Sequence, residues 1–342
     1  MDRLHLDMKE VPTYNFDLSL PANKRWEVIF DSFSGKDIGY LRDEGRKILN
    51  PYSSMISIVD NFIISFSDKI MFYEELQYIS KRTNMLFSEV LLLQLVYEAN
   101  SACTSAIFTI DNKSKTGKSK YSQDSTNRIG RSKYFFRTMD WDMEFLKKFT
   151  IKLNVMREGE MITEAVGWLG LVGYFTATSI KNKYSISVNY RRTTNQMNIL
   201  NNIYRTINGY YPIAYLVRVV VNSHNIKETI KSLKNTQLIS PCYFIVCDWN
   251  TYKDISLVRD CIITRDCDGT VNKRTTELIQ TNCDFDKTGP NILYSIERRN
   301  LFKAILSTTD GSVNDFLRQP IINHETIYLY YMCDGKTEGC WI

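Results

Sequence analysis

Polar and apolar residues alternate along several segments beyond residue 102, a pattern typical of strands with one buried face. The clearest run is formed by Phe149, Ile151, Leu153 and Val155, which are separated by polar residues. Further strands are expected over 103–110, 161–168, 172–179, 184–190, 242–247, 257–265, 275–280 and 326–332. Turns are expected at 158–159 and 181–183, and Asp268-Gly269 predicts a hairpin turn between 257–265 and 275–280.

Apolar residues at helical spacing dominate the chain before residue 103. In this part of the chain an extended segment is expected over 13–20, and helices are expected over 37–49, 54–66, 71–83 and 88–97. Further helices are expected nearer the carboxyl end, over 226–233, 296–306 and 313–317. Ser88 is the expected N-cap of the helix over 88–97. The segment 212–221 fits a helix or a strand, and Pro212 at its start slightly favours a helix. Along the chain, helices come before and after two sets of strands, and this order suggests two sheets with helices packed outside them.

Composition and charge remove several classes of function. The 342 residues have a net charge of +5, from 43 basic and 38 acidic side chains spread along the chain. This mild excess indicates no nucleic-acid partner and at most a modest preference for anionic surfaces. The only histidines are His5, His224 and His324, and the eight cysteines form no C-x-x-C pair. We therefore expect no zinc site, no other metal or cofactor, and no Ser-His-Asp triad.

The segment 112–133 is polar and basic, and its composition predicts a loop. A solvated insertion is the favoured interpretation, with phosphate binding as the alternative.

Cys103 is expected to be the first residue of a strand, just after the predicted helix over 88–97 ends. From the residues alone, Cys103 is most simply a small buried residue at this junction, because free cysteine is among the most buried residue types.

A series of motifs changes that interpretation of Cys103. The pattern Cys103-Thr104-Ser105 followed by Arg137-x-x-Asp140 resembles the acid ceramidase and N-acylethanolamine acid amidase family of N-terminal-nucleophile hydrolases. Other segments resemble the same family in the same order along nearly the whole chain: Val11-Pro12-Thr13-Tyr14, Leu20-Pro21, Lys24-Arg25-Trp26, Gly170-Leu171-Val172-Gly173, Ile262-Ile263-Thr264-Arg265-Asp266, Gln280-Thr281-Asn282 and Arg298-Arg299.

The resemblance implies an α+β fold, a four-layer αββα sandwich with two antiparallel sheets between helical layers. We expect a single hydrolase domain over residues 1–342. Self-cleavage before Cys103 would give an α/β heterodimer of a helical α-chain, 1–102, and a strand-rich β-chain, 103–342. The thiol and the new α-amine of Cys103 would then serve as nucleophile and base on one residue.

The resemblance also implies roles for four other side chains. Asp140 would bind the new ammonium group, and Arg137 would orient the nucleophile or the substrate carbonyl. Asn282 would donate to the developing oxyanion, and Arg299 would lie near the site. Without the resemblance these residues would be an acid in a polar turn, an arginine at a strand edge, a turn asparagine and a charge on a helix surface.

One departure from the family concerns the segment Asn189-Tyr190-Arg191, where the family usually has Asn-Glu-Arg. Tyr190 in place of the glutamate puts self-cleavage or turnover in doubt. The resemblance implies a fatty-acyl amide substrate: ceramide is preferred, and N-acylethanolamine is the alternative. A catalytically silent relative that binds acyl lipids is the competing hypothesis.

The resemblance also bears on where the protein acts. It implies a lysosomal or secreted protein, and peripheral membrane contact through the apolar helix before Cys103 is an option. The first seven residues lack the apolar run of a signal peptide, so a cytoplasmic location is the alternative. Family members commonly close a disulfide loop near the carboxyl end, and the corresponding cysteines here are Cys333 and Cys340; two free thiols are the alternative.

Overall fold

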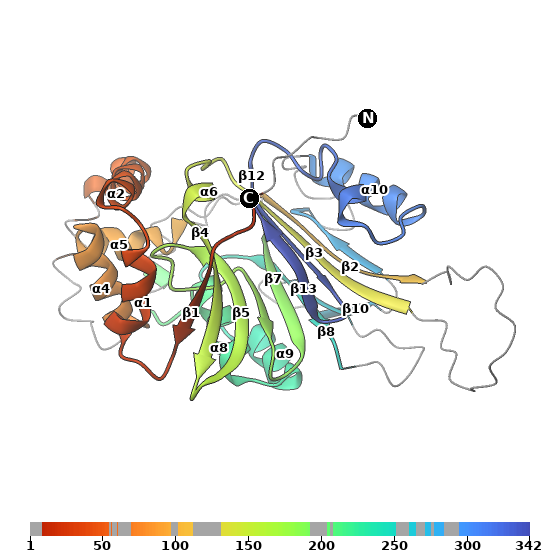
Figure 1. The fold of residues 1–342 in the computed structure, drawn as a ribbon, viewed down its shortest axis with the longest axis horizontal. Helices are drawn as coiled ribbons and strands as arrows, with labels where there is room; N and C mark the ends of the chain where they lie inside the picture. Colours follow the sequence, from red (N-terminus) through yellow and green to blue (C-terminus); the bar gives the residue numbers. More distant parts are fainter. Residues whose placement is uncertain are drawn as a thin grey trace, which may run out of the picture.

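The computed structural model describes residues 9–54, 56, 60, 70–96, 102–111, 131–191, 204–205, 208–250, 260–264, 271–274, 277–283 and 294–342. The strands of this described part form two sheets (Figure 1). The larger sheet has the order β1 (Thr13–Asp17), β4 (Thr150–Arg157), β5 (Glu160–Trp168), β6 (Thr176–Ser179), β7 (Tyr184–Tyr190), β8 (Cys242–Asp248), β9 (Asp260–Thr264) and β10 (Val271–Arg274). The smaller sheet has the order β11 (Glu277–Gln280), β2 (Ala102–Asp111), β3 (Arg131–Asp140), β12 (Thr326–Cys333) and β13 (Lys336–Trp341).

The two sheets lie between helices. Helix α10 (Ser295–Leu306) and the 3-10 helix η6 (Val313–Phe316) pack on the smaller sheet, where Phe302 and Phe316 contact Phe108 and Phe136. Helices α8 (Ile213–Ser223) and α9 (Ile226–Asn235) pack on the larger sheet. Figure 1 shows α10 and the α8–α9 pair on opposite sides of the molecule. The expected αββα sandwich is confirmed, with the difference that β1 and β4 pair in parallel.

The helices that precede β2 form a group beside the β1 edge of the larger sheet, at the left of Figure 1. They are α1 (Ala22–Asp31), α2 (Gly35–Leu49), η1 (Asn50–Tyr52), α4 (Tyr73–Thr83) and α5 (Phe87–Leu93). The capping box of Ser34 and Asp37 explains where α2 begins. Within the described residues, no helix combines the length and the apolar character that crossing a bilayer requires.

A buried ion pair joins these helices to the rest of the fold. Glu75 of α4 accepts from both Nη atoms of Arg218 of α8, at 2.8 and 2.6 Å. It also accepts from Arg25 Nη1 and from Trp26 Nε1, both at 2.8 Å. Burial raises the pKa of Glu75, but Arg218, Trp26 and Arg25 together outweigh it and hold this pKa below its usual range. Glu75 is therefore a charged group at the centre of a buried network.

Some sequence expectations about helices were wrong. Helix α1 was not expected; it begins directly after the extended segment predicted over 13–20, and Pro21 is its N-cap. Ser88 is not an N-cap: α5 begins at Phe87, and the Leu86 N–H donates to Glu89 Oε2 at 2.7 Å. The carboxylate of Glu89 thus satisfies a backbone donor at the start of α5, so a serine cap is not needed.

Other differences concern strands. Strand β9 pairs with the unexpected strand β10, and β11 lies in the smaller sheet, so the predicted hairpin between 257–265 and 275–280 is wrong. Strands β3 and β13 were not expected, and the segment over 212–221 is the helix α8.

Cys333 and Cys340 lie in β12 and β13 as free thiols. Cys340 lies opposite Tyr330 rather than opposite Cys333. Most of the expected helix over 54–66, most of the basic loop and the Asp268-Gly269 turn lie outside the described residues.

Candidate active site

The alternation of side chains along β2 and β3 divides the site into two halves. The antiparallel register places Ala102 opposite Asp140, Cys103 opposite Met139, and Ser105 opposite Arg137. Because successive side chains of a strand point to opposite faces, Cys103, Ser105, Arg137 and Met139 face the larger sheet. Asp140 points to the other face, toward α10.

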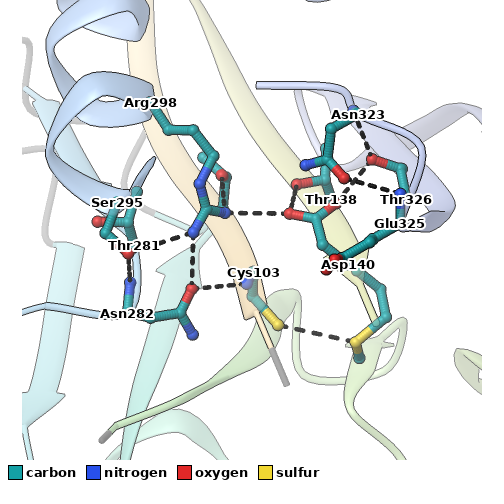
Figure 2. Close-up of polar contacts among 12 residues, drawn as sticks. Cys103, Thr138, Asp140, Thr281, Asn282, Ser295, Arg298, Asn323, Glu325 and Thr326 are labelled. Carbon is teal, nitrogen blue, oxygen red and sulfur yellow. Dashed lines mark hydrogen bonds and ion pairs between the residues drawn. The ribbon is translucent and has the colours of Figure 1, made fainter. Parts of the chain in front are cut away.

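Arg298 of α10 is the centre of the half that faces the helix (Figure 2). Its Nη1 donates to Asp140 Oδ2 at 3.0 Å and to Thr104 Oγ1 at 2.9 Å. Its Nη2 donates to Asn282 Oδ1 at 3.0 Å and to Ser295 Oγ at 3.2 Å. Arg298 and Asp140 are both fully buried. Arg298 therefore ties the end of β3 to the segment that follows β11.

Asn282 connects this network to Cys103. Its Oδ1 accepts from the backbone N–H of Cys103 at 2.7 Å, and its Nδ2 donates to the Tyr190 carbonyl at 2.8 Å. The orientation of the amide is determined by its neighbours, because Cys103 N and Arg298 Nη2 can only donate and the Tyr190 carbonyl can only accept. The backbone nitrogen of Cys103 thus faces an oxygen that a guanidinium group polarises.

Asn189 of β7 organises the half that faces the larger sheet. Its Oδ1 accepts from Arg137 Nη1 at 2.5 Å and from Ser105 Oγ at 2.7 Å. Its Nδ2 donates to the carbonyl oxygen of Gln280 at 2.8 Å and more weakly to that of Cys103 at 3.4 Å. One amide therefore links β7 of the larger sheet to β2, β3 and β11 of the smaller sheet.

The thiol of Cys103 lies in the same half and is buried. Its Sγ lies 3.7 Å from Met139 Sδ, and Arg137 Nη2 is also 3.7 Å from that Sδ. On the face of the smaller sheet that packs against α10, burial raises the pKa of Asp140 despite the nearby Arg298, and burial lowers the pKa of Arg298.

The smaller sheet thus has one buried arginine on each face near Cys103: Arg137 on the face toward the larger sheet and Arg298 on the face toward α10.

The structure brings together most of the residues expected from the sequence, and it adds two details that the sequence did not predict. The arginine that contacts Asp140 and Asn282 is Arg298, whereas Arg299 donates from Nη2 to Cys283 Sγ at 3.1 Å. The side-chain N–H of Asn282, expected to face an oxyanion, donates instead to the Tyr190 carbonyl. It is the Oδ1 of Asn282 that faces Cys103.

Sequence reasoning missed Arg298 and gave no role to Asn189. A signal for Arg298 was present, because it lies four residues before Phe302 and seven before Ile305, the helical spacing of the face of α10 that packs on the sheet. For Asn189 only the resemblance of Asn189-Tyr190-Arg191 to a family motif gave an indication. Its contacts join strands far apart in the sequence, so no local pattern predicts them.

An apolar cavity of about 100 Å³ lies between the amino-terminal helices and the ends of β3 and β5. Trp141, which follows Asp140 directly, and Trp168 form part of its wall, with ring centroids 5.6 Å apart. Leu41, Met85 and Leu93 line the opposite side. The cavity therefore offers apolar surface next to the chain that leaves the site. Among the described residues, no three His, Cys, Asp or Glu side chains lie close enough to hold a metal ion.

Comparisons with known proteins identify relatives of this chain. No protein-family model matches the chain. The uncharacterized protein R632 of Acanthamoeba polyphaga mimivirus is 40% identical over 345 residues, which cover 96% of this chain and 98% of the viral protein. The acid ceramidase of Balaenoptera acutorostrata scammoni is 25% identical over 344 residues, covering 93% of this chain and 82% of the whale enzyme. The N-acylethanolamine-hydrolyzing acid amidase of Mus musculus is 24% identical over 347 residues, covering 96% and 87%.

A solved structure shares the fold. The Caenorhabditis elegans ortholog of N-acylethanolamine-hydrolyzing acid amidase matches with a TM-score of 0.52 at 20% identity, over 70% of this chain and 99% of the nematode chain. The sandwich of two sheets and helices is thus the fold of this acid amidase ortholog. The chain shares a family with the viral protein R632, and it is similar over nearly its whole length to acid ceramidase and N-acylethanolamine-hydrolyzing acid amidase, which are amide hydrolases.

Proposed function

We propose that this protein hydrolyses the amide bond of a fatty-acyl amide, with Cys103 as the nucleophile after self-cleavage of the Ala102–Cys103 bond. The observation that carries the proposal is the 2.7 Å contact between Cys103 N and Asn282 Oδ1. Asn282 is in turn held by Arg298, which pairs with Asp140. Any buried backbone N–H needs an acceptor, but here the acceptor is a side-chain oxygen that also accepts from a buried arginine paired with an acid, and this arrangement supports a role for the Cys103 nitrogen.

Self-cleavage in this proposal is an acyl transfer followed by hydrolysis. The thiol of Cys103 adds to the Ala102 carbonyl carbon, and the Cys103 nitrogen leaves with a proton, which gives a thioester. Water then releases the Ala102 carboxylate and restores the thiol. Cys103 now carries a free α-amine, which Asn282 Oδ1 is positioned to accept from.

Turnover would use the two groups of the new terminus together. The α-amine takes the thiol proton, the thiolate attacks the substrate carbonyl, and the amino alcohol leaves with that proton. Water then hydrolyses the acyl-enzyme to free fatty acid.

The apolar cavity lined by Trp141 and Trp168 supports an acyl chain as the ligand, because it adjoins the end of β3 that carries Asp140. We propose N-acyl sphingosine as the substrate, with N-acylethanolamine as the alternative, because both place a fatty-acyl chain on an amino alcohol. Contact with a lipid surface and a lysosomal or secreted location are part of the same proposal and rest on the family.

A catalytically silent lipid-binding relative remains the second candidate because of Tyr190. Its side chain is buried, and its carbonyl oxygen accepts from Asn282. The backbone at this position therefore supports the network, whereas the carboxylate usual in the family is missing. Only a measurement of cleavage separates the two candidates.

The test is mass spectrometry of purified protein before and after incubation at acid pH. Wild type should yield a fragment that begins at Cys103, and Cys103→Ala should stay intact. Cys340→Ala, a matched change of another buried thiol, should cleave as wild type does. Ceramide and N-acylethanolamine turnover are then measured in parallel. An intact wild type that binds acyl lipid without turnover would refute the enzyme and favour the silent relative.

A further inference from the structure

A second cavity, of about 340 Å³, lies far from Cys103. Strand β4 starts at Thr150, close to the end of β3 that carries Asp140, and ends at Arg157, which lines this cavity. Eight residues of strand span roughly 25 Å. Figure 1 shows β4 running from α6 (Leu146–Phe149) to the opposite end of the sheet, where β1 also ends. The cavity is therefore separate from the candidate active site.

Three arginines line this cavity, which we call the arginine pocket: Arg25 of α1, Arg157 of β4 and Arg218 of α8, together with Asn222, Leu18 and Phe72. Among the described residues, no carboxylate lines it. Behind it, Glu75 pairs with both Arg25 and Arg218, so that these three groups together carry one positive charge. Arg157 adds a second positive charge at the mouth.

Arg157 is the arginine best placed to meet a ligand. Its side chain is exposed, and within the described residues it makes no ion pair, even with Glu160 opposite it in the β4–β5 hairpin. Asn222 Oδ1 is buried, and the hydroxyl of the buried Tyr174 is the donor beside it. The pocket thus presents charged donors to a ligand.

The shape of the arginine pocket favours one class of anion. Arg25 and Arg157 come from different elements, so a tetrahedral group with several oxygens can accept from both, whereas a planar carboxylate best fits a single guanidinium fork. The cavity is larger than a bare ion requires, and Leu18 and Phe72 give it apolar wall. Leu20 and Val28, which are 44% and 67% exposed, extend apolar surface beside Arg25.

We propose that the arginine pocket binds the phosphate group of an organic phosphate, either a soluble phosphate ester or the headgroup of an anionic phospholipid. The phosphate accepts from Arg157 and Arg25, and the ester's organic part lies against Leu18 and Phe72. Nothing in this proposal depends on the chemistry of Cys103.

The test uses the full chain and measures binding rather than activity. Inorganic phosphate and glycerol phosphate are titrated by calorimetry into wild type, Arg157→Gln and Lys181→Gln. Lys181 is an exposed cation in the β6–β7 turn, so its variant loses the same charge elsewhere on the sheet. Loss of one charge-assisted contact should weaken binding about tenfold or more in Arg157→Gln and leave Lys181→Gln unchanged.

A second arm identifies the source of the phosphate. Phosphatidylcholine vesicles with and without phosphatidic acid are sedimented with each variant. A headgroup is indicated if the phosphatidic acid vesicles capture wild type, if Arg157→Gln is no longer captured, and if glycerol phosphate competes with the vesicles. A soluble ester is indicated if glycerol phosphate binds saturably and the vesicles do not capture the protein. Equal losses in both variants, or no saturable binding by wild type, would overturn the proposal. Cys103→Ala should bind as wild type does, so failure of the amidase does not affect this result.

Discussion

Replacing Glu75 by glutamine tests whether the buried network between α4 and α8 stabilises the fold as its geometry implies. Glutamine keeps the shape of the side chain but removes the charge that Arg218 contacts with both Nη atoms. The Arg218 side chain is 3% exposed, so it cannot recover solvation. Arg25, 22% exposed, can do so in part.

The expected magnitude follows from the burial of this pair. Removal of one partner from a buried ion pair costs about 3–5 kcal/mol, because the other charge is left uncompensated. A domain has about 5–15 kcal/mol of stability in total, so Glu75→Gln should lose a large part of it. Because the pKa of Glu75 is lowered in the fold, its contribution is present above its unfolded pKa. That contribution is lost as the pH falls through the folded pKa.

The assay is urea unfolding followed by the fluorescence of the five tryptophans, one of which, Trp26, donates to Glu75. Glu27→Gln is the matched control: Glu27 pairs with Lys24 at the surface, and its loss should cost less than about 1 kcal/mol. The double change Glu75→Gln with Arg218→Met should be less destabilised than Glu75→Gln alone, because no buried charge remains unpaired.

Two results would refute this reasoning about Glu75. One is a loss below about 1 kcal/mol for Glu75→Gln, which would place the network in the class of surface pairs. The other is a double variant in which the two losses simply add, which would mean that Glu75 and Arg218 do not interact.

Three further predictions concern the site and the helix above it. Asp140→Asn should flatten the pH dependence of stability. Burial raises the pKa of Asp140, so the free energy of unfolding of wild type should rise relative to that of the variant as the pH falls through this raised pKa. A difference in urea unfolding that stays constant across pH would argue against this prediction. Arg298→Lys should slow acid self-cleavage about tenfold or more, as judged by mass spectrometry, because lysine cannot contact Asp140 and Asn282 with one planar fork; Arg299→Lys is the neighbouring control, and equal slowing would contradict the assignment. Phe302→Ala should cost about 3–5 kcal/mol in urea unfolding, because Phe302 is fully buried between α10 and the smaller sheet, and a loss under about 1 kcal/mol would be inconsistent with that packing.

Local patterns in the sequence were sufficient for the elements that carry the site. The alternation from Cys103 predicted β2 and placed Cys103 and Ser105 on one face. The resemblance of Arg137-x-x-Asp140 selected the segment that lies opposite. Neither could show that Asp140 and Cys103 point to opposite faces of the sheet, because that depends on the register between β2 and β3.

Contacts between distant segments account for what was missed. The spacing of apolar residues could not show which of two consecutive arginines reaches Asn282, because both Arg298 and Arg299 are buried in α10. The role of Asn189 depends on the packing of one sheet against the other. Strand β13 has little alternation of its own and exists because its backbone pairs with β12.

The parallel pairing of β1 with β4 has a consequence for the chain if it is cut before Cys103. Strand β1 belongs to the first piece, yet it covers the outer edge of the larger sheet from Lys152 to Met156. Without it, the N–H and C=O groups of β4 would form an open edge, which invites a strand from another molecule. A fragment made from residue 103 onward should therefore aggregate, and a peptide containing Thr13–Asp17 should suppress that aggregation by complementation.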